Sequence, residues 1–71
     1  MFAKWLKEKR LDLGLTQQEL AQEMRVSNVL IALLETGKRV PGIKALNKIA
    51  RYFKVDVVFL REMIKEDTNN V

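Results

Sequence analysis

The sequence predicts a compact all-α fold of five short helices. Three observations lead to this fold class: apolar residues recur at steps of three and four, capping residues open several of these segments, and the only strand-like run, residues 55–60, contains a helix-capping aspartate. The 71 residues suffice for one domain with one core. We expect this domain to span residues 1–65, and residues 66–71, which have no apolar periodicity, to form a disordered tail.

The first two helices are bounded by a glycine and by a capping box. Four residues form the inward face of the first helix, which Gly14 ends: Phe2, Leu6, Arg10 and Leu13. Thr16 and Glu19 have the spacing of a reciprocal capping box, and Leu15 can pack on Leu20 as a hydrophobic staple. A second helix is therefore expected to begin directly after Thr16.

Three further helices follow along the chain. Ser27 is the expected N-cap of the third helix, which ends at Thr36–Gly37, and Asp56 is the expected N-cap of the fifth. Pro41 disfavours a helical conformation in the residue before it, so residues 38–42 are expected to form a loop. The apolar spacing predicts a core of Leu6, Leu13, Leu20, Ala21, Met24, Val26, Ile31, Leu34, Leu46, Ile49, Ala50, Phe53, Val55 and Leu60.

The composition argues against several classes of function. The chain has neither cysteine nor histidine, so we expect no disulfide, no metal site and no cofactor. It has one serine and no histidine to activate it, which argues against an enzyme. No apolar run is long enough to cross a membrane and no export signal is present, so we expect a cytoplasmic protein without a membrane partner.

The charge and the arrangement of the central helices favour binding to DNA. The net charge is +4, from thirteen basic and nine acidic residues, which is typical of a domain that binds a polyanion, although a solvated basic surface would look the same. Residues 16–37 are expected to form two short helices joined by a tight turn. In that arrangement one helix can brace across the DNA backbone while the next enters the major groove.

The same segment carries a family motif. The runs LTQQELA at 15–21, VS at 26–27, LE at 34–35 and GK at 37–38, with Ile31 between them, resemble the Cro/C1-type (XRE-like) helix-turn-helix family. The lambda and 434 phage repressor DNA-binding domains and restriction–modification controller proteins belong to this family. The resemblance covers residues 3–64. It implies a sequence-specific transcriptional regulator, of a phage, plasmid or restriction–modification repressor or controller type, with a recognition helix at about residues 27–35.

The resemblance also implies roles for individual residues. Base contacts fall on Asn28, Val29, Ala32 and Leu33, and phosphate contacts on Gln17, Thr36, Lys38 and Arg39. Of the first group only Asn28 can make a bidentate contact, most naturally to adenine, whereas the other three offer methyl contacts suited to thymine. The family pairs an arginine with a glutamate at Arg10 and Glu35, and both lie on apolar helix faces, so we expect a structural ion pair.

Two features of the sequence depart from the family pattern. The recognition helix is apolar on all sides, so Leu30 and Leu33 are expected to form an exposed patch. That patch supports an alternative function, a protein-interaction module that docks another protein through this helix. Arg25 and Lys54 stand where the family often has glycine, and each would cost on the order of 1 kcal/mol if its φ is positive.

The last predicted helix suggests a second subunit. It carries more apolar side chains than one face can bury, and we expect them to form a two-fold homodimer interface. Two copies would bind DNA half-sites roughly 10 bp apart or slightly more. The residues of the expected interface are Val57, Val58, Phe59, Met63 and Ile64.

Overall fold

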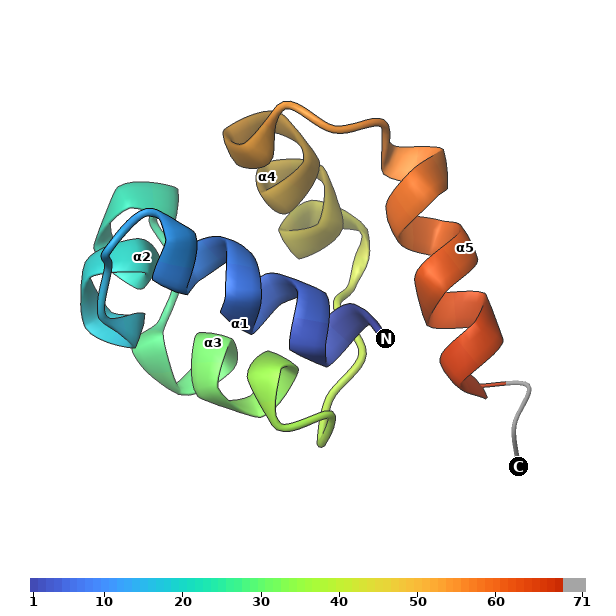
Figure 1. The fold of residues 1–71 in the computed structure, drawn as a ribbon, viewed down its shortest axis with the longest axis horizontal. Coiled ribbons are helices and arrows are strands. Elements are labelled where there is room, and N and C mark those ends of the chain that lie inside the picture. Colours follow the sequence, from blue (N-terminus) through green and yellow to red (C-terminus); the bar gives the residue numbers. More distant parts are fainter. Residues whose placement is uncertain (69–71) are drawn as a thin grey trace.

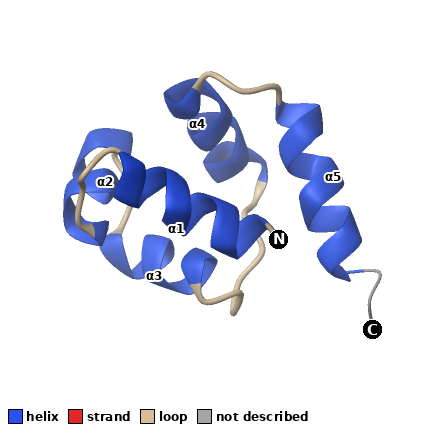
Figure 2. Cartoon of the chain, in the orientation of Figure 1, coloured by secondary structure: helices blue, strands red, loops and turns tan. Residues whose placement is uncertain are grey.

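The computed structural model describes residues 1–68, which form five α-helices around one core (Figure 1). The helices are α1 (Phe2–Asp12), α2 (Gln17–Met24), α3 (Asn28–Glu35), α4 (Ile43–Phe53) and α5 (Val57–Thr68). Within the described range there is no strand (Figure 2), so the prediction of an all-α fold is confirmed. None of these helices is both long and apolar enough to span a bilayer.

The helices pack as two connected groups, one of α1, α2 and α3 and the other of α4 and α5. α2 packs most extensively on α3, and α1 lies against α3 on another side. α4 packs on α2 and α5, and α5 returns to contact α1. The effect is that α3 is held by α1 and α2 while α4 lies at the opposite edge of the molecule in the view of Figure 1.

The starts of the helices follow the capping residues. The capping box of α2 is confirmed: the Glu19 backbone N–H donates to Thr16 Oγ1 at 3.1 Å, and the Thr16 N–H donates to Glu19 Oε1 at 2.8 Å. Ser27 Oγ accepts from the Val29 N–H at 3.1 Å, and Asp56 Oδ1 accepts from the Val58 N–H at 2.8 Å. These side chains satisfy N–H groups that a helix start otherwise leaves without an acceptor.

The first four helices all end in the same turn, which needs one residue of positive φ. That residue is Gly14 after α1 and Gly37 after α3, with φ of 71° and 74°. After α2 and α4 it is Arg25 and Lys54, with φ of 58° and 55°. A side chain at such a position costs roughly 1–2 kcal/mol relative to the right-handed region, so both departures from glycine noted in the sequence introduce backbone strain.

The predicted core is confirmed at ten positions and wrong at one. Leu13 is 54% exposed, because α1 ends at Asp12 and the chain turns away at Gly14. Val26, Phe53 and Val55 are only partly buried and pack against the core. The buried residues are Leu6, Leu20, Ala21, Met24, Ile31, Leu34, Leu46, Ile49, Ala50 and Leu60, joined by Phe2 and Met63, which the prediction of the core left out.

The end of α5 differs from the expected tail. The helix continues through residues 66–68 instead of becoming disordered at 66, and residues 69–71 lie outside the described residues. Asp67 accepts hydrogen bonds from the Phe2 N–H at 2.9 Å and from the Met1 amino group at 2.7 Å. These contacts lower the pKa of the Asp67 carboxyl, the amino group having the larger effect. A carboxylate from α5 thus caps the first turn of α1, where free N–H groups favour negative charge.

Candidate nucleic-acid interface

The α2–α3 pair is a rigid unit because its inner faces are apolar and close. Leu20 and Ala21 of α2 are 0% and 2% exposed, and Ile31 of α3 is 0% exposed. The small Ala21 side chain permits close approach of the two helices. A three-residue turn, 25–27, joins them at the angle that the positive φ of Arg25 sets. This is the geometry of a helix-turn-helix, in which the outer face of the second helix is free to contact DNA.

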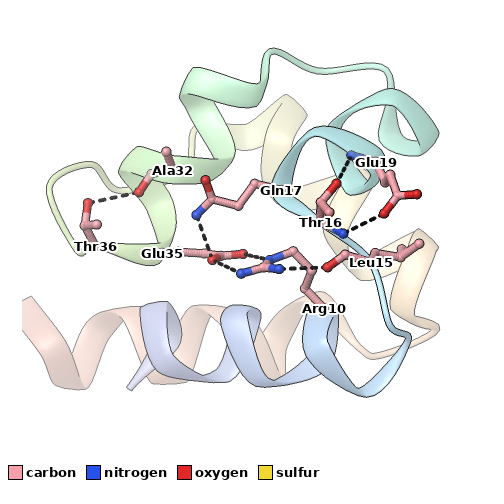
Figure 3. A network of polar contacts seen from close by, with 8 residues as sticks. All are labelled: Arg10, Leu15, Thr16, Gln17, Glu19, Ala32, Glu35 and Thr36. Carbon is pink, nitrogen blue, oxygen red and sulfur yellow. Dashed lines mark hydrogen bonds and ion pairs between the residues drawn. The ribbon is translucent and has the colours of Figure 1, made fainter.

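A buried ion pair fixes the end of α3 to α1. Arg10 Nε donates to Glu35 Oε2 at 2.7 Å and Arg10 Nη2 donates to Oε1 at 3.0 Å, which gives the bidentate geometry of a strong pair (Figure 3). Arg10 Nη1 also donates to the Leu15 carbonyl at 2.7 Å. The Arg10 and Glu35 side chains are 9% and 2% exposed, and the hydrogen bond to Glu35 raises the pKa of Arg10. The pair expected from the sequence is therefore present, between α1 and α3.

Gln17, an expected phosphate contact, belongs to the same set of polar contacts. Its Nε2 donates to Glu35 Oε1 at 3.1 Å, so one amide N–H is held and the second remains as a donor. Gln17 is also the first residue of α2, where backbone N–H groups have no intrahelical acceptor. The sequence predicted a role for Gln17 and for Glu35 but not the hydrogen bond between them, because the two residues are 18 positions apart and no local pattern relates them.

The expected base-contact residues lie on one face of α3. Asn28, Val29, Ala32 and Leu33 have the i, i+1, i+4, i+5 spacing of a helix surface. The first two are exposed, Val29 by 62%, and the other two are partly buried. Leu30, expected to be exposed, is instead partly buried against the core, because α1 and α2 cover α3 on more than one stripe. The exposed apolar surface is therefore smaller than the sequence suggested.

The loop after α3 presents two basic side chains. Lys38 and Arg39 are exposed, and in residues 1–68 neither forms an ion pair. The Thr36 hydroxyl has two acceptors in its own helix, the Ala32 carbonyl at 3.0 Å (Figure 3) and the Leu33 carbonyl at 3.2 Å, and it can donate to one of them at a time. Because a hydroxyl has only one proton, the Thr36 hydroxyl that donates to a carbonyl of α3 cannot at the same time donate to a phosphate.

The expected dimer surface on α5 is divided between core and exterior. Val58 and Phe59 are 54% and 48% exposed, whereas Met63 is 6% exposed and belongs to the core, which removes it from any interface. Val57 and Ile64 are partly buried against the core. The Phe59 ring packs edge-on to Trp5 of α1 with ring centres 6.1 Å apart. Met63, Val57 and Ile64 therefore pack within the single chain.

A turn-linked helix pair with a free outer face and a basic loop beyond it defines a helix-turn-helix DNA-binding domain. The comparisons agree: the chain belongs to the helix-turn-helix family, whose model matches residues 6–60, and the motif places it in the Cro/C1-type branch. This family membership makes the chain a DNA-binding regulator rather than an enzyme.

The relatives are named as transcriptional regulators. The chain is 31% identical over 71 residues to the uncharacterized HTH-type transcriptional regulator YqaF of Bacillus subtilis, covering 99% of this chain and 93% of the relative. It is 40% identical over 57 residues to an uncharacterized HTH-type transcriptional regulator of Archaeoglobus fulgidus, covering 78% and 80%. It is 34% identical over 56 residues to the HTH-type transcriptional activator BcrR of Enterococcus faecalis, covering 79% of this chain but 28% of the relative. No solved structure matches the chain.

Proposed function

We propose that the protein is a sequence-specific transcriptional regulator that binds double-stranded DNA as a homodimer in the cytoplasm, with residues 27–35 in the major groove. One observation carries the proposal: the outer face of α3 presents the exposed Asn28 and Val29, while its inner face is fixed by buried apolar side chains and by the Arg10–Glu35 pair. A helix held this firmly presents its outer side chains at defined positions. Defined positions are what base readout requires.

Phosphate contacts supply the affinity in this proposal. Lys38 and Arg39 extend from the loop as exposed cations, and Gln17 contributes its second amide N–H together with the free N–H groups that begin α2. Glu35 orients the Gln17 amide, and Arg10 neutralises the carboxylate that would otherwise repel a phosphate. Thr36 can join these contacts only by turning its hydroxyl away from the helix carbonyls.

Base contacts supply the specificity. The Asn28 amide can both donate to and accept from adenine, and this bidentate contact is worth roughly 1–3 kcal/mol against a wrong base. Val29, Ala32 and Leu33 carry methyl groups and no donors, so they favour sites rich in thymine, whose 5-methyl group lies in the major groove. The preferred site is therefore expected to combine an adenine opposite Asn28 with flanking thymines.

Two copies would be held together through α5. Val58 and Phe59 are apolar and half exposed, flanked by the partly buried Val57 and Ile64. A dimer of this kind would place two copies of α3 on half-sites roughly 10 bp apart. Bound at a promoter it would repress by occupancy, as phage, plasmid or restriction–modification repressors do. The relative BcrR is named an activator, so activation is the alternative direction of regulation.

The second candidate function is a protein-interaction module that uses the same helix. The observation that favours it is the 62% exposure of Val29, an apolar side chain beside the partly buried Leu33. An exposed apolar pair can serve as a small docking patch as well as a contact for thymine methyl groups.

Selection of bound duplexes from a random pool, followed by uracil substitution, tests the proposal. We expect enrichment of a two-part site, and weaker binding when uracil replaces its thymines, because uracil lacks the methyl group that Val29 and Leu33 contact. Failure to enrich any sequence contradicts the proposal. If uracil has no effect, and Leu33→Ser keeps DNA affinity but abolishes capture of a protein, the docking function is the correct one.

A further inference from the structure

Helix α4 carries a second basic surface, separate from α3. Its sequence from Ile43 to Phe53 contains no acidic residue. Its buried side chains, Leu46, Ile49 and Ala50, occupy one face, and Lys44, Lys48 and Arg51 occupy the other at steps of four and three. All three cations are exposed. We call these three residues the α4 basic face. The i, i+4, i+7 spacing was visible in the sequence, but only burial of the opposite side shows that the three share one exposed face.

Within residues 1–68 no residue of the α4 basic face forms an ion pair. The ion pairs Met1–Asp67 and Arg10–Glu35 lie elsewhere in the fold. Glu23 is the acidic residue at its margin, and the Tyr52 hydroxyl donates to that carboxylate.

Arg25 of the α2–α3 turn adjoins the face and adds to its positive charge. Lys48 Nζ donates to the Arg25 carbonyl at 3.0 Å, which brings the two residues together, and the Arg25 side chain is exposed. Arg25 also holds a positive φ that glycine would adopt without strain. A cation is thus present at a position where the backbone does not favour a side chain.

The α4 basic face lies away from the expected base-contact surface. α4 packs on α2 and α5, and in Figure 1 α3 and α4 lie at opposite edges of the view. The buried side chains of both helices point into the one core, so their exposed faces are directed to different sides of the molecule. A duplex held by α3 would leave the middle of the α4 basic face, around Lys48, open to another partner.

We propose that the α4 basic face binds the phosphate backbone of a second DNA duplex, so that one protein can bridge two DNA segments. This inference rests on the proposed binding of a first duplex by α3. The chemistry favours phosphate over an acidic protein, because protein interfaces have an apolar centre and are depleted in lysine. Phosphate contacts need only cations and polar donors, and Asn47 is exposed between Lys44 and Lys48.

A bridging assay with charge-matched variants tests the proposal. A 30-bp duplex is fixed to beads, protein is added, and retention of a second, fluorescent 30-bp duplex of random sequence is measured at low salt. The test variant is Lys44→Gln/Lys48→Gln/Arg51→Gln. The matched control is Lys4→Gln/Lys7→Gln/Lys9→Gln, which removes the same charge from exposed positions of α1. Thermal unfolding of each variant verifies that the fold is kept.

The α4 variant is expected to lose at least about fivefold of the retained second duplex while binding a single duplex within about twofold of the unchanged protein. The α1 control is expected to match the unchanged protein in both assays. Equal retention by the α4 variant and the α1 control overturns the proposal. The proposal also fails if the α4 variant retains the second duplex but binds polyglutamate less well than the unchanged protein, because that result would identify an acidic protein partner. A Lys38→Gln/Arg39→Gln variant separates the two ideas. If single-duplex binding is unchanged even when these two substitutions are combined with those of the α4 variant, the proposed function fails, whatever the bridging result.

Discussion

Removing the Glu35 carboxylate is the most informative test of how α3 is held. That carboxylate accepts two hydrogen bonds from Arg10 and one from Gln17, and the Glu35 side chain is 2% exposed. Glu35→Ala would leave the Arg10 guanidinium, 9% exposed, without a counter-charge, which costs about 3–5 kcal/mol for a buried pair. At 0.05–0.15 kcal/mol per residue, a chain of 71 residues has a total stability of about 4–11 kcal/mol.

Urea unfolding followed by far-ultraviolet circular dichroism measures this loss. Glu35→Ala is expected to be largely unfolded without denaturant or to unfold at a much lower urea concentration, whereas Glu8→Ala, an exposed glutamate of α1, is expected to change stability by about 0.5 kcal/mol at most. The double variant Arg10→Met/Glu35→Leu is expected to recover much of the loss, since it removes both charges from the core. A cost below about 1 kcal/mol for Glu35→Ala would refute the reasoning, because it would mean that the pair does not hold α3 in place.

Three further predictions concern backbone strain and pH. Arg25→Gly and Lys54→Gly are each expected to raise the free energy of unfolding by about 1 kcal/mol in urea titrations, since glycine adopts their positive φ without strain; a loss of stability would show that the side chains matter more. The pKa of Asp67 is lowered by the amino group of the first residue and by a backbone N–H, so its stabilisation is present above its unfolded pKa and is lost as pH falls through the folded value. Asp67→Asn should accordingly flatten the acid limb of a plot of thermal midpoint against pH, and an unaltered limb would contradict the capping role. The hydrogen bond to Glu23 raises the pKa of Tyr52, so Tyr52 stabilises the fold fully below its unfolded pKa and less as pH rises through the folded value. Absorbance titration of the phenol should show this raised pKa, and Glu23→Gln should lower it; an identical titration in the variant would argue against the bond.

Local signals in the sequence were enough to predict the helices. Capping by Thr16 and Ser27 depends on residues two or three positions away, so the starts of α2 and α3 could be read directly. Ala21 could likewise be placed between helices because it is small within an apolar stripe. These features depend on short-range geometry that every helix shares.

The errors arose where distant parts of the chain meet. Leu30 was expected to be exposed, but its burial depends on how α1 and α2 both cover α3, which periodicity within one helix does not specify. Met63 was placed on a dimer surface, yet the contact of α5 with α1 brings it into the core. Helix α5 continues to Thr68, past the expected end of the domain, and Asp67 there contacts Phe2, 65 positions away.

The expected DNA-contact residues were marked by resemblance, and the structure adds what positions them. The Glu35–Gln17 bond and the inward turn of the Thr36 hydroxyl are side-chain arrangements between or within helices. A sequence pattern identifies the residue type at a contact position but not its hydrogen-bond partners. For Thr36 that distinction changes the expected strength of the phosphate contact.

The affinity of Asn28→Ala and Lys38→Ala for a selected duplex and for a scrambled one tests most directly whether α3 reads DNA. Fluorescence anisotropy should show that Asn28→Ala weakens binding to the selected duplex by roughly 1–3 kcal/mol, and leaves the scrambled duplex unaffected. Lys38→Ala should weaken both duplexes equally and reduce the salt slope by about one. Gln22→Ala, at an exposed position of α2, is the control and should change neither. The account is contradicted if Asn28→Ala has the same effect on both duplexes, or none on either.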